Sequence, residues 1–182
     1  MTDLHRYTDI HSHRRADALR GDTVVCIEPG EAMEPGGTYS VGIHPWSTAS
    51  GPVAQETLEQ LAAQTRDSRV VAIGECGFDR LRGGDMAEQQ RLFEFQARLA
   101  AELGKPLIIH CVRAFDLLLG EAKRLKPEPG SWIVHGFRGK PELARQLLDA
   151  GLGLSLGKHY NAATAAMIPD ERKYCETDEM DD

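Results

Sequence analysis

The feature that most constrains the fold is a regular alternation of helix-like and strand-like segments from residue 53 onward. Strand-like segments are short apolar runs rich in valine and isoleucine, whereas helix-like segments are longer, with apolar residues three and four positions apart. The predicted strands are residues 7–11, 23–27, 38–43, 70–75, 106–110, 131–135, 152–156 and 173–178. The predicted helices are residues 53–66, 86–103, 114–125 and 140–149.

Alternation with short connections predicts parallel strands that are covered by helices. Eight such strands would close into a barrel, whereas an open sheet would need an edge strand and a topological switch point. The helix over residues 86–103 has the clearest pattern, with Leu92, Phe95 and Leu99 on one stripe. Gly104, with a proline two positions later, predicts where this helix ends.

Length and composition favour one globular domain over residues 1–182, since 41% hydrophobic and 27% charged residues are ordinary for such a domain. No apolar run approaches the length of a membrane span, and the charged start MTDLHRYTD does not resemble a signal peptide, so we expect a cytoplasmic protein. The formal net charge of -7 argues against a broad basic surface for nucleic acid. A phosphate-containing substrate would therefore be held locally, by a few arginines, lysines or metal ions.

The four cysteines do not form a CxxC pair, and all lie in or beside strand-like runs: Cys26, Cys76, Cys111 and Cys175. We therefore expect reduced cysteines that behave as small buried hydrophobes, rather than a zinc–thiolate cluster.

Ionisable residues stand at the ends of several predicted strands. Residues two apart share a face of a strand, so the imidazoles of the HxH pair in DIHSH point the same way. In α/β barrels the carboxyl ends of the strands form one mouth, where residues remote in sequence converge. Imidazole and carboxylate are ligands of zinc, manganese and similar ions. The residues in such positions are His11, His13, Glu75, His110, His135 and Asp178.

Each of these residues also has a plain structural explanation. An HxH pair occurs by chance, His110 could be a structural histidine, Glu75 could cap a helix or pair with Arg80, and Asp178 could belong to an acidic tail. Four histidines and two acids at corresponding positions nevertheless favour a metal site. The carboxylate of Glu75 has two oxygens and could bridge two cations, which would make its burial tolerable.

The other histidines differ in their setting. His44, in VGIHPW, ends the third predicted strand and faces the same mouth, so it is a candidate for touching substrate. His5 and His159 have no such context and are expected at the surface.

The segments that carry these residues resemble, in the same order, those of the TatD family of metal-dependent hydrolases and DNases, within the amidohydrolase-like barrels. The resemblance implies a TIM-type (β/α)8 barrel and hydrolysis of phosphodiester bonds, with DNA or another phosphodiester as substrate. The matching segments are DIHSH at 9–13, VGIHP at 41–45, AIGECGFD at 72–79, KPLIIHC at 105–111, IVHGFRG at 133–139 and CETD at 175–178.

The resemblance also implies two divalent ions of zinc, magnesium or manganese. His11, His13 and Asp178 would hold one ion and His110 and His135 the other. Glu75 would bridge the two ions and share in catalysis with Asp178, which would be both ligand and general base.

Two arginines follow predicted strands and are candidates for binding substrate phosphate: Arg113 and Arg138. A guanidinium matches two phosphate oxygens at once, which makes Arg113 the better candidate. Lys140 and Lys158 follow later strands and could add to this grip, although solvated surface charge is the safer explanation of both. Two alternatives stay open: hydrolysis of a small amide, ester or lactone by the same metal pair, and a metal-binding protein without catalysis.

The chain is shorter than the barrels it resembles, which usually have about 250 residues. The segment after HSH has only a few residues where the family carries a helix, and the chain ends four residues after Asp178. We therefore expect a shortened barrel with truncated loops, no C-terminal helical cover and weak closure between its first and last strands. A homo-oligomer would supply the missing cover.

Overall fold

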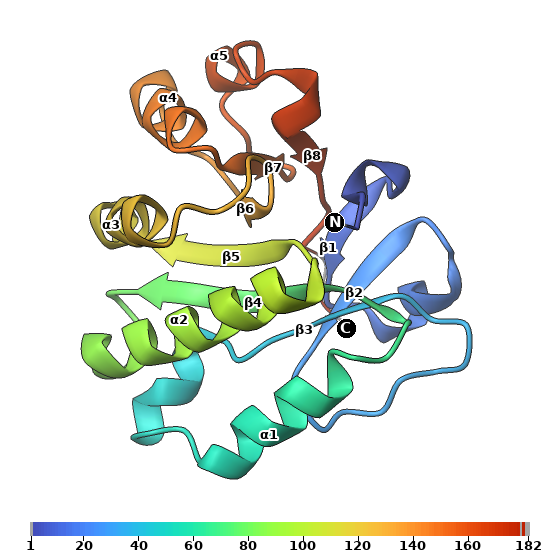
Figure 1. Cartoon of the computed structure of the whole chain (residues 1–182). Helices are drawn as coiled ribbons and strands as arrows, with labels where there is room; N and C mark the ends of the chain where they lie inside the picture. The colour runs from blue at the N-terminus through green and yellow to red at the C-terminus, as the bar shows by residue number, and fades with distance from the viewer. Residues whose placement is uncertain (1, 179, 181–182) are drawn as a thin grey trace.

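The computed structural model describes residues 2–178 and 180, and within them eight strands form one parallel sheet in chain order (Figure 1). The expected α/β architecture, a nearly closed and short TIM-like barrel, is confirmed. The strands are Asp9–Ser12 (β1), Thr23–Ile27 (β2), Tyr39–Val41 (β3), Val70–Asp79 (β4), Leu107–Val112 (β5), Trp132–Val134 (β6), Gly153–Leu156 (β7) and Lys173–Cys175 (β8).

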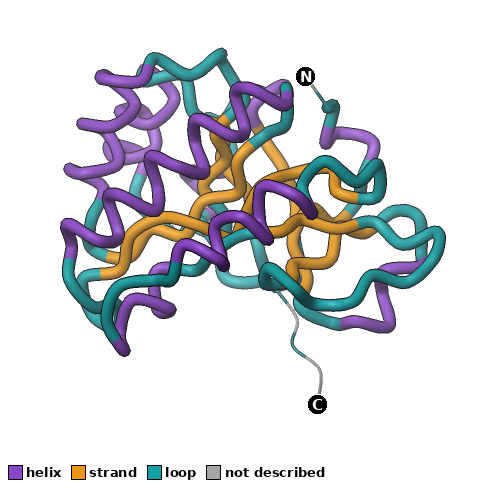
Figure 2. The backbone as a smooth tube through the Cα atoms, turned by 60° about the horizontal axis from the view of Figure 1, so that its bottom comes forward, coloured by secondary structure: helices purple, strands orange, loops and turns teal. Residues whose placement is uncertain are grey.

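Helices lie around the outside of the strands, which occupy the centre of the molecule in Figure 2. The α-helices are Gln55–Gln64 (α1), Met86–Leu103 (α2), Phe115–Leu125 (α3), Pro141–Asp149 (α4) and the short Ala162–Ala165 (α5). Four 3-10 helices join them in the described residues: Leu4–Arg6 (η1), Arg15–Leu19 (η2), Pro45–Ser50 (η3) and Asp170–Arg172 (η4). None of the described helices has both the length and the apolar character needed to cross a bilayer.

Helix α2 has both of its predicted ends. The Asp85 side chain accepts a hydrogen bond from the Ala87 amide at the N-terminus, and Gly104 takes the left-handed conformation that stops the helix. Its buried face carries Phe93, which packs against Phe78 of β4 and Trp132 of β6 at centroid distances of 4.8 and 5.0 Å. Helix α2 is thereby fixed over the middle of the sheet.

The prediction that β4 ends at Glu75 was wrong, because the strand continues to Asp79. Two glycines allow this continuation. Gly74 and Gly77 have φ values of +137° and +140°, and a Cβ at either position would lie within 2.4 Å of a β5 carbonyl oxygen. The register between β4 and β5 shifts at this point, so Glu75 projects from an irregular part of the strand. Strand β5 likewise continues past His110 to Val112.

Two apolar clusters fill the molecule. The larger lies between the strands and the helices that cover them. The smaller combines side chains from strands that lie across the barrel from one another, such as Ile10, Val24, Ile108 and Ile133, and therefore fills the barrel interior. The interior is thus a packed core, which leaves the polar mouth at the carboxyl ends of the strands.

The barrel closes at the seam between β8 and β1 through a few separate hydrogen bonds. Among the described residues no backbone ladder joins these two strands. Asp9, only 8% exposed, instead accepts hydrogen bonds from the Thr177 hydroxyl at 2.6 Å and the Thr177 amide at 3.2 Å. The Asp178 amide donates to the His11 carbonyl at 3.0 Å. The expectation of weak closure is confirmed, and the seam holds two of the predicted site residues in place.

We predict that Thr177→Val lowers the free energy of unfolding by about 1.5 kcal/mol, the low end for hydrogen bonds to charged groups, because it removes the hydroxyl that Asp9 accepts. Urea denaturation of both proteins measures this change. Thr8→Val is the control, since the Thr8 hydroxyl bonds to Asp22 in an exposed position and should matter little. Equal effects of the two substitutions would show that the seam bond does not stabilise the barrel.

Candidate metal centre

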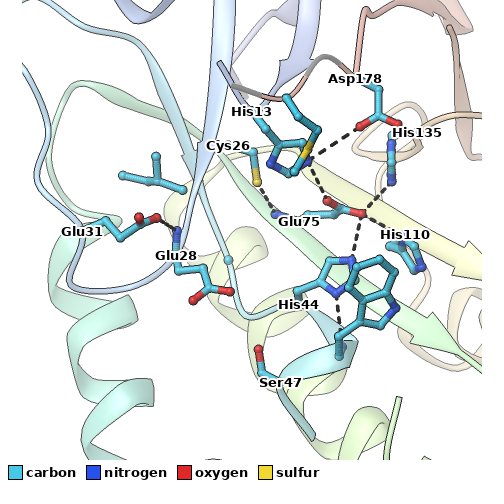
Figure 3. A pocket seen from close by; sticks show the side chains of 14 residues that line it. His13, Cys26, Glu28, Glu31, His44, Ser47, Glu75, His110, His135 and Asp178 are labelled. Carbon is cyan, nitrogen blue, oxygen red and sulfur yellow. Dashed lines mark hydrogen bonds and ion pairs between the residues drawn. The ribbon is translucent and has the colours of Figure 1, made fainter. Parts of the chain in front are cut away.

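The predicted site residues meet at the carboxyl ends of the strands, in and behind a cavity of about 580 Å³ (Figure 3). His11 lies in β1 and His13 one residue beyond it; His110 lies in β5 and His135 one residue beyond β6. Asp178 was predicted to end the last strand, but it lies three residues past β8, with φ of 52°. The convergence at one mouth that the sequence predicts is therefore present, although strand ends and site residues coincide less closely than expected.

Glu75 stands at the centre of this group, with a side chain that is only 5% exposed. Its Oε2 atom lies 3.3 Å from His11 Nε2 and 3.5 Å from His13 Nε2. The same two imidazole nitrogens lie 3.6 and 3.7 Å from Asp178 Oδ1. These four side chains form the group on the Oε2 side.

The other carboxylate oxygen of Glu75 faces a second group. Oε1 lies 2.7 Å from His135 Nε2, 2.8 Å from His110 Nδ1 and 3.1 Å from His44 Nε2. The two oxygens of one carboxylate thus divide five histidines into two sets. Arg80, the alternative partner for Glu75 on sequence grounds, pairs instead with Asp116.

Charge in the cluster follows from burial and proximity. Burial alone would raise the pKa of Glu75, but the charge of His135 and the nearby imidazoles hold it well below its usual value. Burial would lower the pKa of His135, yet the carboxylates of Glu75 and Glu176 raise it well above the ordinary value. The hydrogen bond to Glu75 likewise raises the pKa of His13. These directions describe the side chains alone, and a bound cation would replace the protons.

His11 provides a test of whether these side chains suit a cation. Its side chain is 0% exposed, and neither ring nitrogen has a hydrogen-bond partner among the described residues. The 3.3 Å approach to Glu75 lacks the alignment of a hydrogen bond. A buried nitrogen without a partner is costly, and a cation would satisfy it. In the part of the chain that the structure describes, three sets of side chains have ligand atoms within 4.8 Å of one another and could hold an ion: His11, His135 and Asp178; His11, Cys26 and Glu75; and His44, Glu75 and His110.

Three further carboxylates contact the histidines, two through an imidazole ring and one through the backbone, and the sequence reasoning missed all of them. Asp79 Oδ2 lies 3.0 Å from His110 Nε2, and Glu176 Oε1 lies 3.4 Å from His135 Nδ1. Asp9 accepts the His11 backbone amide at 3.0 Å. Their signal was present, since each lies in one of the segments that resemble the family. Such partners fix the ring orientation of metal-binding histidines.

The candidates for binding substrate are distributed unevenly. His44 lines the cavity, as the sequence predicts, while Arg113 and Arg138 are exposed and lie outside its lining. Among the described residues no arginine or lysine lines the cavity, whereas Glu28 and Glu31 do. The cavity itself is therefore acidic. Phosphate could approach it only with cations bound.

An aromatic residue on the rim also escaped the sequence analysis. Trp46 lines the cavity and is 41% exposed, and its indole nitrogen donates to Asp79 Oδ2 at 2.7 Å. The Arg82 guanidinium lies over the indole ring, 4.7 Å from its centroid. In the fold, Trp46 lies beside both His44 and Asp79, and Arg82 lies beside Asp79. Neither Trp46 nor Arg82 was identified as a site residue from the sequence.

The remaining histidines and the cysteines give a mixed result. His5 and His159 are exposed, as predicted. The cysteines are free, and Cys76 is buried, but Cys175 is exposed and the prediction that it is buried was wrong. Strand β8 presents alternate residues to solvent, and Cys175 is on that face. Burial raises the pKa of the Cys26 thiol, which lines the cavity.

Comparison with known proteins gives consistent matches. The family model for TatD related DNase matches residues 20–181. The 3'-5' ssDNA/RNA exonuclease TatD of Klebsiella pneumoniae is 35% identical over 144 residues, which are 78% of this chain and 50% of that protein. The same exonuclease of Citrobacter koseri is 33% identical over 175 residues, 95% of this chain and 59% of that protein. The chain thus spans about half the length of the curated relatives it matches.

Solved structures agree on the fold. A TatD homologue of Escherichia coli K12 superposes with a TM-score of 0.77 at 25% identity, covering 97% of this chain and 80% of the homologue. A TatD-family hydrolase of Entamoeba histolytica gives a TM-score of 0.71 at 21% identity, covering 95% and 73%.

We predict that the metal-free protein is more stable at about pH 6 than at about pH 9. Glu75 raises the folded-state pKa values of His13 and His135, so their protonation stabilises the protein below the unfolded value of about 6.5. This contribution is lost as the pH rises through the folded-state values. Glu75 is ionised at both pH values because its own pKa is lowered.

Urea denaturation in chelator at the two pH values measures this difference, and Glu75→Gln should abolish most of it. Glu142→Gln, exposed on α4, is the control and should preserve it. An unchanged pH dependence in Glu75→Gln would show that Glu75 does not control the charge of these histidines.

Proposed function

The chain belongs to the TatD-related DNase family, and on this basis we propose that it is a divalent-metal-dependent hydrolase of phosphodiester bonds in single-stranded nucleic acid, a DNase above all. The observation that carries the proposal is the division of the site by the two oxygens of Glu75. Relatives named as 3'-5' ssDNA/RNA exonucleases support the substrate class.

We assign two ions to the two groups. His11, His13 and Asp178 would hold the first, His110 and His135 the second, and Glu75 would bridge them. Support comes from the orphaned His11 nitrogens and from a donor set of imidazole and carboxylate, which suits zinc or manganese and, less well, magnesium. Two such ions, when bound, lower the pKa of a water and neutralise charge on the phosphate oxygens.

The protein's own residues complete the reaction. The Asp178 carboxylate oxygen that faces away from His11 and His13 would accept a proton from the attacking water, whose oxygen bonds to phosphorus as the bond to the leaving alkoxide breaks; the alkoxide takes a proton from solvent. Asp178 suits this role because its side chain is 38% exposed, so it reaches the cavity water, while Glu75 is enclosed. The products are a phosphate monoester and an alcohol.

Trp46 supports a substrate with unstacked bases. A half-exposed indole on the rim of the cavity, with its nitrogen fixed by Asp79, offers a surface on which a nucleobase can stack. Arg82, over the same ring, places a positive charge beside it. Duplex DNA keeps its bases stacked, so a single strand or a frayed end fits this rim better.

Phosphates farther along the strand would meet the exposed arginines. Arg113 directly follows β5 and Arg138 lies three residues beyond His135, so both are at the mouth end of the barrel. His44 remains assigned to substrate, because it lines the cavity between Trp46 and Glu75. We also propose a cytoplasmic location and a homo-oligomer that covers the thinly protected side of the barrel near β1 and β2, where η2 and a loop stand in place of α-helices.

A substrate panel tests the proposed function. Protein loaded with zinc, manganese or magnesium is incubated with labelled single-stranded DNA, bis-p-nitrophenyl phosphate and p-nitrophenyl acetate, each with and without chelator. We expect chelator-sensitive cleavage of the first two substrates. Turnover of the acetate ester alone would indicate hydrolysis at carbon instead, and no turnover with bound metal would indicate a binding protein.

Asp178→Asn should lower the turnover number by about two to four powers of ten, because the amide keeps a coordinating oxygen but does not accept a proton at neutral pH. Turnover is compared at matched metal loading. Asp170→Asn, in which the side chain is 98% exposed, is the control and should retain full activity. Near-normal turnover in Asp178→Asn would place the general base elsewhere.

Arg113→Ala should weaken binding of a single-stranded oligonucleotide several-fold while metal content stays unchanged. The slope of log binding constant against log salt concentration should fall by the amount that corresponds to about one phosphate contact. Fluorescence anisotropy at several salt concentrations, together with metal analysis, measures both. Arg145→Ala, exposed on α4, is the matched control. Joint loss of metal and binding in Arg113→Ala would identify a structural role instead.

A further inference from the structure

Cys26 is the cysteine that faces the candidate metal centre. It is the penultimate residue of β2, lines the cavity, and its Sγ atom accepts the Glu75 amide at 3.3 Å (Figure 3). Sγ, a nitrogen of His11 and a carboxylate oxygen of Glu75 all lie within 4.8 Å of one another. A thiol therefore lies beside His11 and the Glu75 carboxylate, where only imidazole and carboxylate were expected.

The other cysteines do not share this position. Cys76 is buried with its sulfur 3.7 Å from the Ile108 carbonyl, and Cys175 is exposed on β8. Cys111 follows His110 but does not line the cavity, and burial raises its pKa to about 12. Within the described part of the chain, Cys26 is thus the single thiol that lines the cavity, beside the exposed thioether of Met180.

The neighbouring His11 independently indicates a ligand at this place. Its side chain is fully buried, both ring nitrogens lack hydrogen-bond partners, and Nε2 is directed between Glu75 and Asp178. An ion bound by His11 would therefore lie close to Glu75, and Cys26 Sγ belongs to the same cluster of ligand atoms.

We propose that Cys26 is an additional ligand of the ion held by His11, His13, Glu75 and Asp178, and that it biases this position toward zinc, cobalt or cadmium over magnesium and manganese. This inference rests on the metal centre of the proposed function. Zinc binds sulfur at about 2.3 Å and imidazole nitrogen at about 2.1 Å, so sulfur and nitrogen on one five-coordinate ion lie about 3 to 4 Å apart. Because the present separations are at most 4.8 Å, side-chain movements of about 1 to 2 Å would bring the sulfur and the nitrogen to these distances.

The chemistry of the step is simple. The S–H bond of Cys26 breaks, its proton passes to solvent, and the thiolate sulfur donates an electron pair to the ion. Magnesium and manganese prefer oxygen and gain little from sulfur, whereas zinc, cobalt and cadmium accept it readily. The Glu75 backbone amide donates a hydrogen bond to Cys26 Sγ, and a metal-bound thiolate can still accept it, so the buried amide keeps its partner.

Cobalt titration of the metal-free full chain tests the proposal. Wild-type protein should show visible d–d bands together with a near-ultraviolet thiolate-to-cobalt charge-transfer band. Cys26→Ser and Cys26→Ala should lose the charge-transfer band, retain visible bands, and bind zinc at least about tenfold more weakly with manganese affinity unchanged. Cys111→Ser should behave as the wild type. Zinc X-ray absorption of the wild type should show a sulfur neighbour at about 2.3 Å, a measurement that needs no variant.

The outcomes separate this proposal from the proposed function. Visible bands without charge transfer in the wild type, a band that survives both Cys26 substitutions, or a zinc shell without sulfur would overturn the role of Cys26 alone. Failure to bind any divalent ion would overturn the metal centre and this ligand together.

Discussion

The structure depends on one buried carboxylate. Removing the charge of Glu75 from water costs several kcal/mol, and without close partners the group would be neutral. Five imidazole nitrogens within 3.5 Å offset that cost, and they come from β1, β5 and the segments that follow β1, β3 and β6. Glu75 therefore links strands that are far apart in the sequence. Its two oxygens divide the histidines into two groups, one on each side of the carboxylate.

Three carboxylates around these histidines, those of Asp9, Asp79 and Glu176, fix the positions of the histidine side chains or backbone. Asp79 and Glu176 each hold the far nitrogen of an imidazole, and Asp9 holds the backbone of β1 and the seam to β8 at once. The same bonds that close the barrel also orient the site. The barrel is short and has few covering helices. Its mouth is nevertheless well defined, because the histidines contact Glu75 at the centre of the site and a second ring of carboxylates around it.

Much of this arrangement could be predicted from the sequence, because it depends on local signals. The HxH pair, the carboxylate after VVAIG and the capped helix α2 each reveal themselves within a few residues. The rest depends on tertiary contacts. The length of β4 is set by the close approach of Gly74 and Gly77 to β5, and the position of Asp178 by the seam rather than by strand pairing. Nothing in the sequence near Trp46 and Arg82 indicates that they lie at the rim of the cavity. Arg113 was expected to reach the cavity but lies outside its lining.

The most direct measurement of the central claim is a crystal structure of the protein soaked in zinc, with anomalous difference density calculated at the zinc edge. The account predicts two peaks separated by the Glu75 carboxylate, one near His11, His13 and Asp178 and one near His110 and His135. A single peak on one side, or zinc bound only at Glu28 and Glu31, would contradict a bridging role for Glu75 and with it the two-ion site.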